Sequence, residues 1–336
     1  METIQNRSSW KPILRTVIGK TGRRPKPIAP TVKLTQIAVH AVPRLTRIST
    51  LSFVYAKTSD DSDGSCDTEV IFPEILRITG HHLRNLHIQS PFAMYLPPQL
   101  GSLESFSVNA SGRYHRPEIH DIMLEKVSTF LLTHQSTIRD VSFSIDNPIL
   151  DISPILQCLQ DMSRLHTIEL CLSYGTISST ATANFQGGRE ILEKHRQHLR
   201  SLSLSFVVDR VIGWAVPAFF RQDWCSVKLP NLRNLTIRIP SVPFRRDLGI
   251  YIRHFSSSLV SLKIMHVPFS AHVGDSKLRS FCVMLGDFPC LQDLSLYLSN
   301  FNLEQLIVFA STLPHLHSLL LHYSYQPLRI NSVSRF

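Results

Sequence analysis

A six-residue pattern of apolar side chains, L-x-x-L-x-L, recurs along most of this chain and constrains its fold more than any other feature. The copy at Leu232, Leu235 and Ile237 is representative. Its last two apolar positions are two residues apart, which is the period of a β-strand with one buried face. The other clear copies begin at Leu83, Leu103, Ile138, Leu165, Leu199, Leu259, Leu291 and Leu316, and a less regular copy begins at Ile48. The pattern therefore predicts about ten strands that bury the same face.

Segments with helical spacing lie between many of these copies, which are 20 to 35 residues apart. Each segment carries apolar residues that would share one face of a helix. The predicted faces are Met123, Val127, Phe130 and Leu131 in one unit, Leu278, Phe281, Cys282 and Leu285 in a second, and Leu303, Leu306, Ile307, Ala310 and Leu313 in the last. One strand and one helix cannot bury their own apolar faces, but stacked neighbours can. We therefore predict an α/β solenoid.

The repeats resemble those of leucine-rich-repeat proteins of the ribonuclease-inhibitor-like kind, which have long helical units. The irregular lengths and the Leu-Pro-x-Leu entries at Leu229 and Leu313 are similar to the repeat regions of fungal F-box proteins. The resemblance covers roughly residues 48–325. It implies a curved parallel sheet on the concave side, helices on the convex side, and about ten irregular repeats. For the function, it implies substrate recognition in ubiquitin ligation, with a ubiquitin-ligase adaptor as a partner.

The sequence departs from the family consensus in two places. The consensus Asn or Cys eight positions after the first Leu is replaced by Pro91, Ser111, Asp146, Ser173, Val207, Pro240, Val267, Ser299 and Ser324. We therefore expect irregular turns after the strands. The segment from Phe72 to Leu76 resembles the opening of an F-box, but the strand expected from Leu83 leaves no room for the helices of that module. We interpret it as the helix of the first repeat and expect no F-box.

The net charge of +10 is concentrated near the amino terminus. Residues 1–47 contain ten Lys or Arg and one acid, Glu2, whereas the rest of the chain contains 25 Lys or Arg and 24 Asp or Glu. The repeat body is therefore nearly neutral, and its concave positions show no basic stripe of the kind that nucleic-acid binding requires. RNA or DNA binding through the basic tail remains a third, lower-ranked hypothesis, which predicts a steep salt dependence.

We divide the chain into a basic tail, residues 1–33, and a solenoid, residues 34–336. The composition of the tail favours a disordered segment. The alternatives are a mitochondrial presequence or a nuclear-targeting cluster from Lys20 to Lys26. Within the solenoid, residues 34–39 predict an extra strand that caps the open end, and residues 57–69 predict a solvated acidic loop without the calcium-binding spacing of an EF-hand. Residues 209–228 contain Trp214, Phe219, Phe220 and Trp224, which we expect to pack in the core, with a partner-binding patch as the alternative.

The sequence contains no apolar run long enough to span a bilayer. We expect a cytoplasmic or nuclear protein, with a mitochondrial location as the alternative that the basic tail suggests. The six cysteines lack C-x-x-C spacing and are interpreted as buried free thiols in a reducing compartment. The 16 histidines lack the H-E-x-x-H order, and no G-x-S-x-G motif is present. We therefore expect no enzyme activity and no catalytic, cofactor-binding or metal-binding residues.

The remaining candidate for function is the surface formed by the residues between the buried strand positions. In a curved solenoid these residues face the concave side. Most of them are small and polar. The large side chains among them are Arg238, Lys263, Met265, Tyr297 and His322, and these are the predicted partner-binding residues. We predict a non-enzymatic protein–protein interaction scaffold. The alternatives are a structural or organelle-targeted repeat protein addressed by its basic amino terminus, and a solvated sheet face without a ligand.

Overall fold

The computed structural model describes ten stretches of the chain, namely residues 48–53, 68–89, 93–110, 117–145, 152–174, 187–208, 223–238, 246–269, 274–298 and 303–323. They contain a single sheet of ten strands that follow one another in chain order. Every neighbouring pair of strands is parallel. The strands are β1 (Thr50–Phe53), β2 (Asn85–Gln89), β3 (Ser105–Ala110), β4 (Asp140–Ile145), β5 (Thr167–Tyr174), β6 (Ser201–Val208), β7 (Asn234–Arg238), β8 (Ser261–Phe269), β9 (Asp293–Leu298) and β10 (Ser318–Tyr323).

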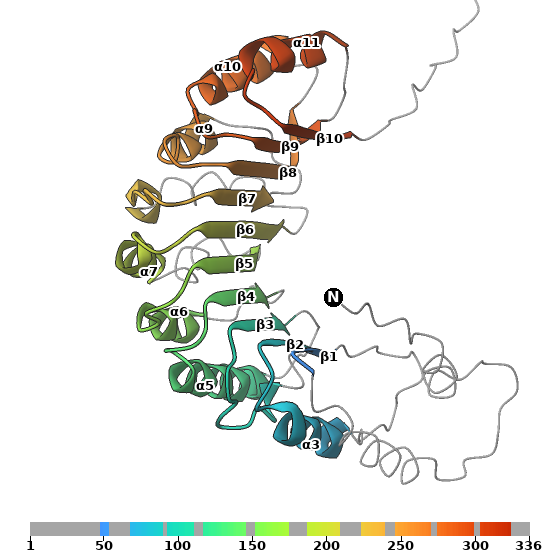
Figure 1. The fold of residues 1–336 in the computed structure, drawn as a ribbon, viewed down its shortest axis with the longest axis vertical. Coiled ribbons are helices and arrows are strands. Elements are labelled where there is room, and N and C mark those ends of the chain that lie inside the picture. Colours follow the sequence, from blue (N-terminus) through green and yellow to red (C-terminus); the bar gives the residue numbers. More distant parts are fainter. Residues whose placement is uncertain are drawn as a thin grey trace, which may run out of the picture.

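Helices alternate with the strands and lie along one side of the sheet (Figure 1). They are α3 (Thr68–Thr79), α5 (Pro117–Thr133), α6 (Ser153–Gln160), α7 (Gly188–His195), α9 (Arg246–Arg253), α10 (Gly274–Gly286) and α11 (Leu303–Thr312), together with the 3-10 helix η3 (Asp223–Ser226). The strands line the inner side of the resulting arc, and the helices occupy its outer side (Figure 1). The architecture is the predicted leucine-rich-repeat-like α/β solenoid of about ten repeats.

The register of the sheet explains why the L-x-x-L-x-L pattern specifies this fold. Leu235 of β7 lies beside Leu202 of β6 and Leu262 of β8. Each of these leucines is almost fully buried. The same register stacks equivalent apolar residues along the whole sheet, so that every repeat buries its neighbour's leucines. Burial of each such side chain stabilises the fold by about 1.5–3 kcal/mol.

The first apolar residue of each pattern lies before the strand, and in the eight copies between the first and the last it is also buried, as Leu232 and Leu259 show. The residue that follows it extends the main-chain pairing into the turn. The N–H of Arg233 donates to the carbonyl of Arg200 in the preceding repeat at 2.8 Å, and the N–H of Val260 donates to the carbonyl of Arg233 at 2.8 Å. Consecutive repeats are therefore held in register from the turn onward.

Most of the predicted helical faces are confirmed. Met123, Val127, Phe130 and Leu131 of α5 are buried, as are Phe281, Cys282 and Leu285 of α10. The ring of Phe130 lies 4.8 Å from that of Phe106 in β3, which joins the helix layer to the sheet.

The prediction for the last helix, α11, is wrong in part. Ile307 is 60% exposed and Ala310 is also exposed, whereas Phe309, which the predicted face omitted, is buried. Among the described residues, α11 packs against only one neighbouring helix, α10. A helix at the end of the described stack buries fewer of its apolar positions, and helical spacing in the sequence cannot reveal this.

The first repeat matches its prediction. The less regular copy at Ile48 forms β1, whose Leu51 lies beside Leu86 of β2. The segment from Phe72 to Leu76 belongs to α3, and both of these residues are buried. The chain runs from the end of α3 at Thr79 to β2 at Asn85, so no further helix fits between them.

Several predictions lie outside the described residues. They are the basic tail at 1–33, the capping strand at 34–39, residues 57–67 of the acidic loop, and Trp214, Phe219 and Phe220. The last two positions of the predicted acidic loop, Thr68 and Glu69, are the first residues of α3. Trp224 lies in η3.

Candidate functional site

The side chains between the buried strand positions form three rows along the inner face of the sheet. The register places Asn234 beside Ser201 and Ser261 in the first row, and Thr236 beside Ser203 and Lys263 in the second. The third row places Arg238 between Ser205 and Met265. The solenoid therefore brings residues that are some 30 positions apart in sequence into rows, in which neighbouring residues on adjacent strands are about 4.8 Å apart.

The five predicted partner-binding residues lie on the last four strands, but they do not form one regular patch. Arg238 and Met265 are direct neighbours across β7 and β8, and Tyr297 and His322 are direct neighbours across β9 and β10. The register between β8 and β9 shifts after Ile264. The five residues therefore fall into two neighbouring pairs, with Lys263 in the adjacent row.

The irregular junction between β8 and β9 brings Met265 over the second row. The hydroxyl of Ser295 lies 3.8 Å from the sulfur of Met265, and Ser295 itself is buried. Met265, Tyr297 and His322 are half-buried, whereas Arg238 and Lys263 are exposed. This end of the inner face therefore combines two exposed cations with partly covered larger side chains. Such a surface is suited to contact a protein partner.

The other end of the inner face is organised by hydrogen bonds between neighbouring strands. The amide of Asn85 donates to the hydroxyl of Thr50 at 2.9 Å, and a ring nitrogen of His87 lies 2.7 Å from the hydroxyl of Ser107. The hydroxyl of Ser142 donates to the carboxylate of Glu169 at 3.0 Å. These side chains therefore use part of their hydrogen-bonding capacity on one another.

A second charged feature, which was not predicted from the sequence, lies at the amino ends of the strands. Arg139, His166, Arg200 and Arg233 immediately precede β4, β5, β6 and β7, and we call them the amino-edge row. Main-chain hydrogen bonds of 2.8 Å connect each member to the next. The signal was present in the sequence as the residue that follows the first leucine of each pattern. The predicted site does not include this residue because it lies just before the strand, outside the alternating strand positions.

Arg139 and Arg200 act electrostatically on His166, which lies between them in the amino-edge row. The pKa of His166 is lowered, first by partial burial and then by the charges of Arg200 and Arg139, while Asp140 opposes the shift. In the part of the chain that the structure describes, the guanidinium groups of Arg139, Arg200 and Arg233 make no salt bridge. All three arginines are exposed.

Histidines near the helix ends join neighbouring repeats. The ring of His134 accepts a hydrogen bond at Nε2 from the N–H of Leu100 at 2.8 Å. Nδ1 of His254 donates to the carbonyl of Cys225 at 2.9 Å. Within the described ranges, no three His, Cys, Asp or Glu side chains gather in a way that could hold a metal ion. These histidines therefore have structural partners.

Burial alters the chemistry of two cysteines. It raises the pKa of the Cys282 thiol to about 12, and it also raises the pKa of the Cys158 thiol. Cys225 is buried as well, Cys171 is half-buried, and Cys290 is exposed. The prediction of buried free thiols therefore holds for three of these five cysteines, and Cys66 lies outside the described residues. A thiol with a raised pKa is a poor nucleophile at neutral pH.

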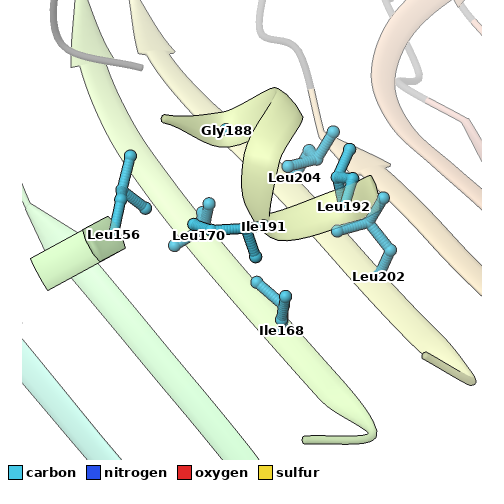
Figure 2. A pocket seen from close by; sticks show the side chains of 8 residues that line it. All are labelled: Leu156, Ile168, Leu170, Gly188, Ile191, Leu192, Leu202 and Leu204. Carbon is cyan, nitrogen blue, oxygen red and sulfur yellow. The ribbon is translucent and has the colours of Figure 1, made fainter. Parts of the chain in front are cut away.

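A small cavity lies between the sheet and the helices of two neighbouring repeats (Figure 2). Its volume is about 10 Å³, and all its lining residues are apolar or glycine. The lining residues are Leu156, Ile168, Leu170, Gly188, Ile191, Leu192, Leu202 and Leu204. The space is no larger than one water molecule needs, and its walls offer no polar side chain, so it is a packing gap.

No protein-family model matches the chain, and the comparison with curated proteins finds no match. Of the helices in the described ranges, none combines the length and the apolar character needed to cross a membrane.

Proposed function

We propose that this chain is a non-enzymatic protein–protein interaction scaffold that binds its partner on the inner face of the sheet. The observation that carries the proposal is the alignment of inner-face residues into rows across neighbouring strands, with Arg238, Lys263 and Met265 together on β7 and β8. Large side chains that contact a partner at the centre of an interface contribute most of its binding energy. Tyr297 and His322 extend the same surface to β10.

The chemistry of the described residues supports an interaction role. The cavity between the layers is too small for a substrate. His134 and His254, at helix ends, form hydrogen bonds with main-chain groups of other repeats, and burial raises the pKa of the Cys282 and Cys158 thiols. The inner face of the sheet is formed by ten strands, so residues from many repeats share one surface (Figure 1).

A matched pair of triple variants tests the proposal in affinity purification with the full chain as bait. The first variant combines Arg238→Ala, Lys263→Ala and Tyr297→Ala on the inner face. The second combines Lys126→Ala, Arg253→Ala and Val283→Ala, which are exposed helical positions of similar chemistry. We expect the first triple to lose a partner that the wild-type chain and the second triple retain.

Equal recovery of every partner by both triples would contradict the proposal. Thermal unfolding of both variants is measured in parallel, because Tyr297 is half-buried. If Tyr297→Ala destabilises the fold, the double variant at the exposed Arg238 and Lys263 replaces the triple.

The more specific role, substrate recognition in ubiquitin ligation, rests on the resemblance of the repeats to those of F-box proteins. That role predicts a ubiquitin-ligase adaptor among the purified partners. If the purified complexes contain no adaptor, this part of the proposal fails, whereas the scaffold function stands.

The second candidate function is a structural or organelle-targeted repeat protein. The observation that favours it is the concentration of ten Lys or Arg in residues 1–47. Imaging a tagged copy that lacks residues 1–33 tests it. A changed location of the truncated protein would support a targeting signal in residues 1–33, and an unchanged location would contradict it.

A further inference from the structure

The amino-edge row is a compact positive surface with defined ends. Arg139, His166, Arg200 and Arg233 occupy four successive repeats, which corresponds to a length of about 14 Å at the usual spacing of strands. Arg164 and His198, three positions before β5 and β6, are exposed and lie beside the row. The His198 ring is close enough to act on His166.

The row ends on both sides because the charge is neutralised or absent there. At the same position before β2 and β3, Arg84 and Glu104 form an ion pair at 3.8 Å. The equivalent positions before β8 and β9 are Val260 and Gln292, which carry no charge. The positive surface is therefore limited to four repeats near the middle of the solenoid (Figure 1).

The three guanidinium groups lie at fixed intervals set by the sheet. Arg200 and Arg233 precede adjacent strands, whereas Arg139 and Arg200 are separated by the strand that follows His166. Main-chain hydrogen bonds hold the Cα positions in place, so only the side chains must be ordered when a ligand binds. Guanidinium groups form paired hydrogen bonds with carboxylates, and several at fixed spacing favour a ligand with several carboxylates.

We infer that the amino-edge row binds a short acidic segment of a partner protein in an extended conformation. Alternate residues of an extended chain are about 6.6 Å apart, so three acidic side chains on one face span about 13 Å, which matches the length of the row. The inference depends on the proposed function in one respect, which is that the ligand is a protein. The binding site and the acidic character of the ligand do not depend on it.

The distribution of charge favours an acidic peptide over a nucleic acid. Asp140 adjoins the row at the start of β4, and Glu169 lies further along β5 on the inner face. Strong nucleic-acid binding depends on a positive footprint that contacts many phosphates, usually six to ten. The amino-edge row spans only four repeats, with an ion pair on one side and uncharged residues on the other. It can therefore contact fewer phosphates than such binding requires.

Fluorescence anisotropy with the full chain tests this inference. The probe is a fluorescein-labelled peptide of alternating glutamate and serine, and its control replaces every glutamate with glutamine. An oligouridylate with the same number of negative charges represents the nucleic-acid alternative. We expect the glutamate peptide to bind more tightly than either of the other two probes at about 50 mM salt, and its affinity to fall as salt rises to about 200 mM.

Two matched variants locate the binding site. The variant with Arg139→Gln, Arg200→Gln and Arg233→Gln removes three charges from the row. The control with Lys126→Gln, Arg253→Gln and Arg279→Gln removes three charges from exposed helical positions. We expect the first variant to lose affinity for the glutamate peptide by about tenfold or more, a loss of about 1.4 kcal/mol, and the control to change by less than about twofold.

Equal losses of peptide affinity in the two variants would show that overall charge, and not the amino-edge row, determines binding. That result would overturn the inference. Tighter binding of the oligouridylate than of the glutamate peptide would overturn it in favour of nucleic acid. Loss of peptide binding in the Arg238, Lys263 and Tyr297 variant would assign the peptide to the inner face, which contradicts this inference but not the proposed function. If the peptide binds the row while inner-face substitutions affect no partner, only the proposed inner-face function fails.

Discussion

Nε2 of His195 donates a hydrogen bond to the main-chain carbonyl of Leu159, 2.7 Å away, and so joins the end of α7 to the end of α6 in the preceding repeat. Both residues are buried. A carbonyl can only accept, so the ring carries its proton on Nε2. His134 and His254 make comparable contacts with main-chain groups of preceding segments. A histidine at or just after a helix end is therefore a recurring means of joining adjacent repeats in this solenoid.

The burial of His195 predicts that stability falls below neutral pH, because burial outweighs the Leu159 hydrogen bond, which acts to raise the pKa of the ring. Burial, with smaller contributions from Lys194 and His198, lowers the pKa of His195 from its ordinary value of 6.5. As the pH falls below 6.5 toward the folded-state pKa, the unfolded chain binds a proton before the folded chain does, so the free energy of unfolding decreases. We expect His195→Gln to reduce this pH dependence, because glutamine can donate to the Leu159 carbonyl but does not titrate.

Denaturant unfolding over a series of pH values measures this effect. His198→Gln is the matched control, because His198 is an exposed histidine only three positions away. A His195→Gln variant that keeps the full pH dependence of the wild-type protein would contradict the assignment.

The register of the sheet predicts opposite consequences for adjacent residues of β7. Leu235 is fully buried between Leu202 and Leu262, whereas Thr236 is half-buried on the inner face. Leu235→Ala should reduce the free energy of unfolding by about 2–5 kcal/mol, because it removes buried methyl groups and leaves a cavity. Thr236→Ala should change it by less than about 1 kcal/mol. Chemical denaturation of both variants measures these changes. Similar losses of unfolding free energy in the two variants would contradict the register.

Gly80 should not tolerate a side chain. A Cβ there would lie 2.5 Å from the carbonyl oxygen of Leu76 and 2.7 Å from a methyl carbon of Leu100. We expect Gly80→Ala to destabilise the protein by about 1–3 kcal/mol, because the backbone after α3 must shift to relieve the overlap.

Gly286→Ala is the control for this substitution. Its closest contact would be the Thr312 carbonyl at 3.2 Å, a milder overlap at the last residue of α10. Alanine is also a better helix former than glycine. Differential scanning calorimetry should show a clearly lower melting temperature for Gly80→Ala than for Gly286→Ala, and the reverse order would refute the close packing at Gly80.

Thiol reactivity should separate Cys282 from Cys290. Burial raises the pKa of Cys282 to about 12, so that almost no thiolate forms at pH 8, whereas Cys290 is exposed. Brief alkylation of the native protein at pH 8, followed by mass spectrometry of each peptide, should show modification of Cys290 but not of Cys282. Alkylation in denaturant is the control and should modify both. Rapid alkylation of Cys282 in the native protein would contradict this prediction, because it would show that the packing around α10 opens.

The sequence specified the repeat architecture because its leucines are local signals that recur. The period of two at Leu235 and Ile237 predicts a strand, and repetition predicts the stack. The same local logic failed at α11, where Ile307 is exposed. Helical spacing identifies which residues share a face, but it does not report whether a neighbouring helix covers that face.

The candidate sites were predictable to different degrees. The rows containing Arg238 and Lys263 followed from the alternation of strand residues, and the structure confirms the register that places them side by side with their neighbours. The shift between β8 and β9 near Met265 was not predictable, because no local residue pattern marks it.

The L-x-x-L-x-L pattern alone determined the strands, their buried faces and their stacking order, because each of these depends on residues only two or three positions apart. Tertiary structure alone decided which side chains from distant repeats become neighbours. Arg139, Arg200 and Arg233 are spread over almost a hundred residues, yet the parallel register brings them to one edge. A repeat body that is nearly neutral overall therefore acquires a local positive surface that its composition conceals.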